Sequence, residues 1–296
     1  MKRRYLIFLA VFLATLLPSI LEAKQAAARK ASALPQTIIN PKDGSELILI
    51  PAGAFIMGSP VGEGRSGELP RHRVYLSAYY IGKYEVTNKQ FAKFVNDPKS
   101  GYRVQGNWKD YYTSGRENHP VVGITWKDAQ AYCRWTNLRL PTEAEWEKAA
   151  RGTDGRKYPW GNKWEPGDLN WVGEGDEKLN SWIEEGRIPS KLPTEPVGSY
   201  KQGASPYGCL DMAGNVWEWC SDWYGEKYYG NSPSSNPPGP GPGSGQYKVL
   251  RGSSWGSGLP DLWRCAFRLK ANPDVGYDGT GIRLVRPCKT DPGGVK

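Results

Sequence analysis

The sequence predicts an α+β protein, built as one loop-rich domain in which short helices and short strands are joined by irregular segments. Glycine and proline are abundant, with 36 and 24 among 296 residues, and this indicates many turns. Helix-capping patterns occur three times before residue 152 and helical periodicity is lost after it. The hydrophobic fraction of 39% is sufficient for a single packed core.

The N-terminal region predicts export. Three basic residues at positions 2–4 precede an apolar run over residues 5–20 and a small residue, Ala23, a pattern typical of a bacterial secretory signal peptide spanning 1–23. A permanent membrane anchor is the alternative, although the run is near the lower length limit for a spanning helix. No cysteine lies at the cleavage region, so attachment through a lipid is not expected. We expect a periplasmic or secreted protein with no permanent membrane span after signal cleavage.

The remaining chain divides into a linker, a folded domain and a tail. Residues 24–45 are polar, rich in alanine and interrupted by proline, which predicts a flexible linker. The folded domain is expected over 46–288, followed by a tail at 289–296. Residues 47–50 (LILI) predict the first buried strand, and Gly53 the turn into a second.

A further strand is predicted in "HRVYLSAYYIGKYEVT", where apolar residues alternate with polar ones. Three helices follow, with Thr87, Thr125 and Thr142 as N-caps. Glu145 completes a capping box in the third helix, and Gly152 ends it. These patterns place all the predicted helices in the first half of the domain.

Two irregular stretches and the distribution of charge complete the description of the domain. A loop rich in glycine and tryptophan is predicted for 158–186, and a flexible surface excursion for the Pro/Gly/Ser stretch 229–246.

The formal charge of +9 includes the basic signal region, and the other basic residues are scattered among acidic ones. A nucleic-acid partner is therefore not expected.

The motifs "IPAGAFIMGS", "RLPTEAEWEKAARG", "YGCLDMAGNVWEW", "VLRGSSW" and "GIRLVR" occur in an order that resembles the formylglycine-generating enzyme family, also called the sulfatase-modifying factor family, over about 47–286. This resemblance implies a variant of the C-type lectin fold, with small twisted sheets. The family includes sulfatase-activating oxidases, hercynine oxygenases, exported pyoverdine-maturation proteins and retroelement-diversified binding proteins. Function must therefore be argued from the site.

The metal centres of the catalytic relatives are missing from this sequence. The resemblance implies two thiolates that hold Cu(I) after the "GSSW" segment, yet Ser257 stands at the first position and the second falls near Asp261 or Leu262. Because Cu(I) requires soft ligands, we expect no Cu(I) and no formylglycine-generating activity. The three-histidine iron site of hercynine oxygenases is excluded, since His72 and His119 are the only histidines.

The "DMAGNVWEW" segment resembles the family's structural Ca²⁺ turn. The implied ligands are the carbonyl oxygens of Ala213, Gly214 and Val216 and the carboxylate of Glu218, with Asn215 shaping or joining the turn. Such hard oxygen donors suit Ca²⁺. The alternative is that Glu218 is only hydrogen-bonded beneath its neighbouring tryptophans.

An exported protein can form disulfides, but an odd number of cysteines leaves at least one without an intramolecular partner. The resemblance implies a partner for Cys133 near residue 284, so Cys288 is a candidate, and it leaves Cys265 without its usual partner. Cys209 and Cys220 could pair. The connectivity stays open among the five cysteines: Cys133, Cys209, Cys220, Cys265 and Cys288.

The family's substrate-binding loops suggest where a ligand would bind. Aromatic rings beside guanidinium groups can receive a peptide, a glycan or an aromatic small molecule. The alternative is that the tryptophans and Arg268 belong to the core and its salt bridges. The candidate ligand-binding residues are Trp255, Ser257, Asp261, Trp263, Arg264 and Arg268.

Three functions are compatible with these patterns. The first is an exported, Ca²⁺-stabilised binding or accessory module without formylglycine-generating activity, whose partner is such a ligand or an envelope protein. The second is an oxidoreductase like the pyoverdine-maturation proteins, acting on a peptidic or aromatic metabolite, with Asp261 or Cys265 as participants. The third is a retroelement-diversified ligand-binding protein.

Overall fold

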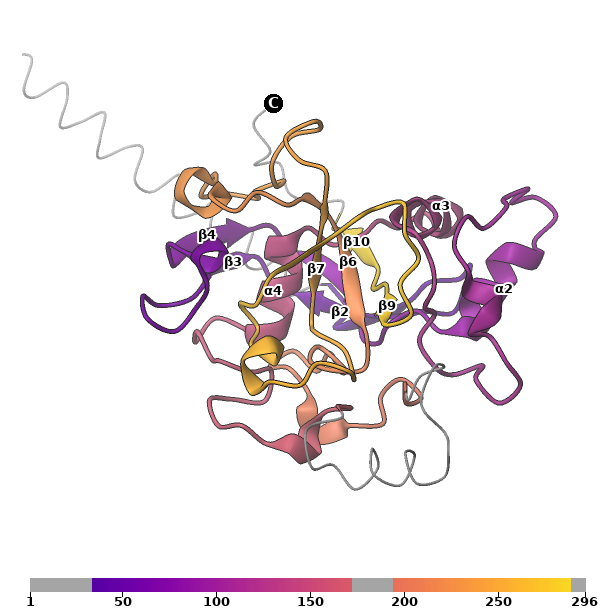
Figure 1. Cartoon of the computed structure of the whole chain (residues 1–296), viewed down its shortest axis with the longest axis horizontal. Coiled ribbons are helices and arrows are strands. Elements are labelled where there is room, and N and C mark those ends of the chain that lie inside the picture. The colour runs from indigo at the N-terminus through magenta and orange to yellow at the C-terminus, as the bar shows by residue number, and fades with distance from the viewer. Residues whose placement is uncertain (1–33, 172–193, 289–296) are drawn as a thin grey trace, which may run out of the picture.

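The computed structural model describes residues 34–171 and 194–288, and its architecture is the predicted α+β type with much irregular chain (Figure 1). The helices of the described part are α2 (Asn88–Asn96), α3 (Trp126–Thr136) and α4 (Glu143–Arg151), with short 3₁₀ turns between elements. The strands are β1 (Thr37–Ile39), β2 (Glu46–Ile50), β3 (Gly53–Met57), β4 (His72–Leu76), β5 (Tyr79–Gly82), β6 (Trp217–Trp223), β7 (Lys248–Arg251), β8 (Leu269–Ala271), β9 (Thr280–Gly281) and β10 (Val285–Pro287).

The N-terminal half of the domain contributes most of two sheets. One is antiparallel with the order β1-β2-β5-β10, and the other is the β3–β4 hairpin. The segment predicted as one strand after residue 72 therefore forms two strands. The chain breaks at Ser77 and Ala78 because β4 pairs with β3, whereas β5 pairs with β2 in the other sheet.

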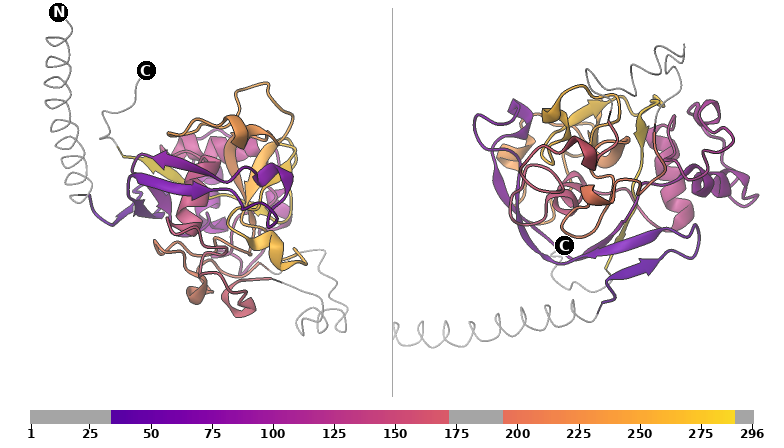
Figure 2. Two further views of the ribbon diagram at one scale, coloured as in Figure 1. Left: turned by 90° about the vertical axis from the view of Figure 1, so that its left-hand side faces the viewer. Right: turned by 90° about the horizontal axis from the view of Figure 1, so that it is seen from below.

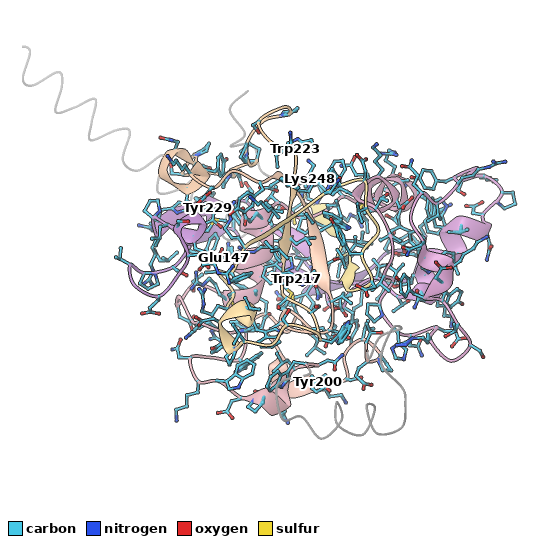
Figure 3. All side chains as sticks on the ribbon, in the orientation of Figure 1. Glu147, Tyr200, Trp217, Trp223, Tyr229 and Lys248 are labelled. Atoms are coloured by element: carbon cyan, nitrogen blue, oxygen red, sulfur yellow. The ribbon has the colours of Figure 1, made fainter. Side chains whose placement is uncertain are left out.

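The third sheet has the order β8-β7-β6-β9 and provides the frame of the site. Its pairs are antiparallel except for β6 with β9. The register of β6 against β7 shifts between Trp219 and Trp223, as at a bulge. Trp217 begins β6, while Trp223 ends it beside Lys248 of β7 (Figure 3), whose ammonium lies 3.9 Å from the Trp223 ring centroid.

All three predicted helix starts are confirmed. Thr87, Thr125 and Thr142 each accept a hydrogen bond from the backbone N–H three residues later, and each helix has a complete capping box. The third helix ends at Gly152, with a φ of 71°. These caps depend on residues three apart, which explains why the sequence identifies them.

Two apolar clusters hold these elements together. The first joins α2 and α3 to Trp219 and Leu250 of the third sheet. The second surrounds α4. This helix lies between the β3–β4 hairpin and the β6–β7 pair, and α2 and α3 lie on the other side of the β6–β7 pair (Figures 1 and 2). Every residue of α4 is buried, including its glutamates. This helix therefore needs internal partners for its charges.

The domain begins earlier than the predicted boundary at residue 46. Strand β1 lies inside the predicted 24–45 linker and pairs with β2. Asp43 is buried and accepts a 2.7 Å hydrogen bond from the Tyr132 hydroxyl of α3. The second half of the predicted linker is thus folded, because its polar residues find partners in the domain.

The Pro/Gly/Ser stretch is likewise only partly a surface excursion. Its residues 234–236 bind the outer edge of β4: Tyr75 N–H donates to the Ser234 carbonyl and Asn236 N–H donates to the Tyr75 carbonyl, both at 2.8 Å. Residues 241–244 are exposed, as predicted.

All five cysteines lie in the described part of the chain and all are free, so neither the Cys209–Cys220 nor the Cys133–Cys288 disulfide is formed. The predicted signal peptide lies outside the described residues. Over 34–171 and 194–288, no helix has the length and hydropathy needed to cross a bilayer.

Candidate functional site

The site is built on the turn that leaves β7. Gly252 and Ser253 both have left-handed backbones, with φ of 90° and 64°, so the chain reverses sharply after Arg251. Two backbone hydrogen bonds then tie this turn to the predicted calcium turn. Gly214 N–H donates to the Gly252 carbonyl at 2.9 Å, and Trp255 N–H donates to the Asn215 carbonyl at 3.1 Å. The two predicted sites are therefore neighbours.

Ser257, which the family resemblance sets at the first expected thiolate position, closes a tight loop. Its N–H donates to the Ser254 carbonyl at 3.1 Å, and its hydroxyl accepts from Ser254 N–H at 3.4 Å. The hydroxyl of Ser253 and the indole N–H of Trp255 are buried and have no partner among the described residues. The turn therefore presents hydroxyl and indole groups, which do not bind Cu(I).

Cys265 is the cysteine nearest to this turn along the chain. Its side chain is buried, and burial raises the pKa of the thiol to about 12. The thiolate, which is the reactive form, is therefore disfavoured. Among the described residues no three His, Cys, Asp or Glu side chains are grouped as they would be around a metal ion.

Three of the predicted ligand-binding residues face the interior, so the structure assigns them to the scaffold instead. Trp263 packs against other tryptophans. Arg264 makes a bidentate pair with buried Glu68 at 2.6 and 3.0 Å, and Arg268 makes one with Glu143 at 2.6 and 2.7 Å. For Trp263 and Arg268 the structure agrees with the alternative reading, in which these residues belong to the core and its salt bridges.

The other three candidates lie nearer the surface. The Asp261 side chain is 66% exposed and lies 3.7 Å from Lys157 Nζ. Trp255 is partly exposed, whereas Ser257 is only 9% exposed. The surface that this turn offers to a ligand is thus mainly Asp261 and Trp255.

Sequence reasoning missed the ion network beneath the turn. Arg251 is fully buried and pairs with Glu143 at 3.1 Å and with Glu147 at 2.6 Å. It also donates to the carbonyls of Cys265 and Ala266, at 2.6 and 3.1 Å. The spacing of the two glutamates, four residues apart on one helix, predicts only that they share a helix face and does not identify the cation between them. The network fixes the end of β7 against α4.

The predicted calcium turn differs from its expected chemistry at Glu218. Both carboxylate oxygens of this buried residue accept hydrogen bonds from Arg283, at 2.7–3.1 Å, and one also accepts from the Trp146 indole at 2.7 Å. The carboxylate is therefore neutralised by a guanidinium cation. Glu218 does not fit the role of a calcium ligand in this arrangement.

A different pair of carboxylates lies beside the same turn, and sequence reasoning did not select it. Glu85 is buried, one of its oxygens accepts from Asn215 Nδ2 at 2.9 Å, and the other has no partner in the described part. Burial and the nearby Asp211 charge raise the pKa of Glu85 well above its ordinary value, and burial raises the pKa of Asp211 to about 6. The unpartnered Glu85 oxygen is a hard donor of the kind that Ca²⁺ takes.

The two histidines each make one polar contact within the domain. A ring nitrogen of His72 lies 2.9 Å from the Pro70 carbonyl, and one of His119 lies 3.2 Å from the Thr194 hydroxyl. Burial lowers the pKa of His119. Both contacts agree with structural roles.

The fold and the turn together define a protein of the sulfatase-modifying-factor class. Residues 33–288 match the family described as sulfatase-modifying factor enzyme 1-like domain, and the chain belongs to this family. It is 35% identical to the formylglycine-generating enzyme of Streptomyces coelicolor, over 89% of this chain and 96% of that protein.

Other relatives show how widely the domain is used. The chain is 35% identical to serine/threonine-protein kinase pkn1 of Chlamydia caviae over 83% of its own length, but it spans only 38% of that protein. The solved structure of PvdO from Pseudomonas aeruginosa matches with a TM-score of 0.71 and 26% identity, over 86% of this chain and 99% of that one.

Proposed function

We propose that the chain is an exported, calcium-stabilised binding or accessory module that lacks formylglycine-generating activity. The observation that supports this proposal is the Ser254–Ser257 loop, which has a hydroxyl at the position where the family resemblance implies a Cu(I)-binding thiolate. The buried Cys265 thiol, with its raised pKa, offers no replacement. Periplasmic or secreted location rests on the basic and apolar N-terminal sequence.

The test is oxidation of a cysteine-containing peptide by the purified chain after loading with Cu(I), with the Streptomyces coelicolor enzyme as the positive control. We expect no oxygen-dependent conversion and no copper retained after gel filtration. Conversion of the peptide would refute the proposal. A Cys265→Ser variant that lost such activity would then identify a rearranged oxidase.

Calcium is proposed at the turn that Glu85 and Asp211 approach. The unpartnered Glu85 oxygen, the Asp211 carboxylate and the carbonyl oxygens of Ala213, Gly214 and Val216 would hold the ion. A bound ion would stabilise the turn that supports Trp255 and would neutralise two buried acids. The proposal replaces Glu218 with Glu85 and Asp211 as the acidic ligands.

The likeness to PvdO favours a second candidate, an oxidoreductase that acts on a peptidic or aromatic metabolite. Of its two predicted participants, exposed Asp261 is accessible, whereas buried Cys265 is not. Oxygen uptake and absorbance changes with aromatic peptides, compared between the natural chain and Asp261→Asn, test this candidate. No uptake with either protein would eliminate it.

A further inference from the structure

A shallow cavity of about 560 Å³ lies beside Trp160, on a loop that the site described above does not use. Its walls come from the Trp160–Asp168 loop and from Gln202. None of the residues of the β7 turn lines it. The volume is within the range of small-molecule sites, roughly 300–1,000 Å³.

The loop that carries Trp160 is held rigidly. Tyr158 and Gly161 exchange backbone hydrogen bonds of 2.8 and 3.1 Å, and the Trp160 indole donates to the Lys163 carbonyl at 2.9 Å. The Tyr158 ring is stacked on Trp160 with an interplanar angle of 5°. Trp164 continues the aromatic cluster inward to buried Trp263. An aromatic platform that is already ordered loses little conformational freedom when it binds a ligand.

One face of the Trp160 ring is covered by Tyr158, which does not line the cavity. Trp160 itself does line it and is partly exposed. The cavity therefore combines an apolar ring surface with polar walls.

The polar walls provide complementary hydrogen-bonding groups. Glu165 and Asp168 are acceptors, Lys163 is a donor, and the amides of Asn162 and Gln202 are both. Gln202 comes from a distant segment that packs closely on this loop, since a Cβ atom at Gly203 would lie only 2.0 Å from the Asp168 carbonyl.

We propose that this cavity binds a saccharide, with a pyranose ring against Trp160 and its hydroxyl groups on the carboxylate and amide walls. Sugars present apolar C–H faces together with hydroxyls that both donate and accept, which matches this lining. Two carboxylates against one lysine disfavour anionic ligands. The ligand class is therefore a neutral or amino saccharide. The inference does not depend on the function proposed for the β7 turn.

The experiment is calorimetric titration of the full chain with three trisaccharides, namely cellotriose, the glucosamine trimer chitotriose and trigalacturonate. We expect binding of cellotriose or chitotriose and weaker or no binding of trigalacturonate. Trp160→Ala should weaken binding about ten-fold or more, and Trp160→Phe, which keeps a ring, should weaken it less. Tyr247→Ala, which removes an exposed ring that does not line the cavity, is the matched control.

Gln202→Ala keeps the aromatic stack intact and tests the polar wall in a variant that is expected to fold. The unfolding temperature of every variant is measured alongside. Absence of binding of the neutral and amino trisaccharides at millimolar concentration overturns the proposal. So does preference for trigalacturonate, or binding that neither Trp160→Ala nor Gln202→Ala weakens.

Discussion

Replacement of Arg251 by methionine should destabilise the domain strongly. The guanidinium is fully buried between Glu143 and Glu147 and donates to two carbonyls, at distances of 2.6–3.1 Å. Methionine fills similar space but leaves these acceptors without a donor. Breaking a buried ion pair from one side costs about 3–5 kcal/mol. For a domain of this size, the unfolding temperature should fall by roughly 6–20 °C.

Thermal and urea unfolding followed by circular dichroism measure this loss. Lys127→Met is the matched control, because the Lys127–Asp274 pair is equally short at 2.8 Å while its side chains are 57% and 62% exposed. Its removal should cost less than about 1 kcal/mol. The double variant Arg251→Met/Glu147→Gln should lose less than the sum of its single variants. Equal losses in Arg251→Met and Lys127→Met would refute the reasoning that burial makes this pair important.

Three further predictions concern the surroundings of the turn. Burial and the charge of Glu143 raise the pKa of Asp222 from 3.8 to about 8. The folded state therefore binds a proton that the unfolded state releases, and the free energy of unfolding should fall as pH rises from about 4 to 8. Urea unfolding measured across this pH range should show a smaller fall for Asp222→Asn. Gly214→Ala should cost about 1 kcal/mol or more of stability beyond the cost of Gly44→Ala. Both glycines have φ near 85°, but a Cβ atom at Gly214 would lie 2.5 Å from the Asn170 carbonyl, whereas one at Gly44 meets open space. Calcium should raise the unfolding temperature, and EGTA should reverse that rise. The rise should be smaller in Glu85→Gln; an equal rise in this variant would remove Glu85 from the proposed ligands.

The parts of the fold that the sequence predicts are those encoded locally. The caps at Thr87, Thr125 and Thr142 connect residues three apart, so they can be identified without tertiary information. Strand β1 was missed because a three-residue strand acquires its structure only by pairing with β2. The split between β4 and β5 also depends on which strand each one meets.

The pairing of charged residues at the site could not be predicted either, because it also depends on contacts between distant segments. Arg251 and Glu143 are 108 residues apart in the chain, and Arg268 and Glu143 are 125 apart, so no local pattern identifies them as partners. Glu218 and Glu85 illustrate the converse. The motif resemblance indicates Glu218, whose charge Arg283 already balances, while the buried carboxylate with an unpartnered oxygen in the described part of the chain belongs to a different segment.

The positions of the tryptophans separate the scaffold from the surface available for binding. Trp263 is buried within a cluster whose outer members, Trp160, Trp164 and Trp171, are partly exposed. The buried Trp263 ring fixes the outer rings in place. Substitution of Trp263 should therefore weaken the binding of a ligand at Trp160 only by loosening the outer rings. Saccharide binding in a Trp263→Phe variant, measured with its unfolding temperature, distinguishes these roles. We expect lower stability, with binding retained at temperatures where the variant is folded. Loss of binding without loss of stability would instead place Trp263 in contact with the ligand.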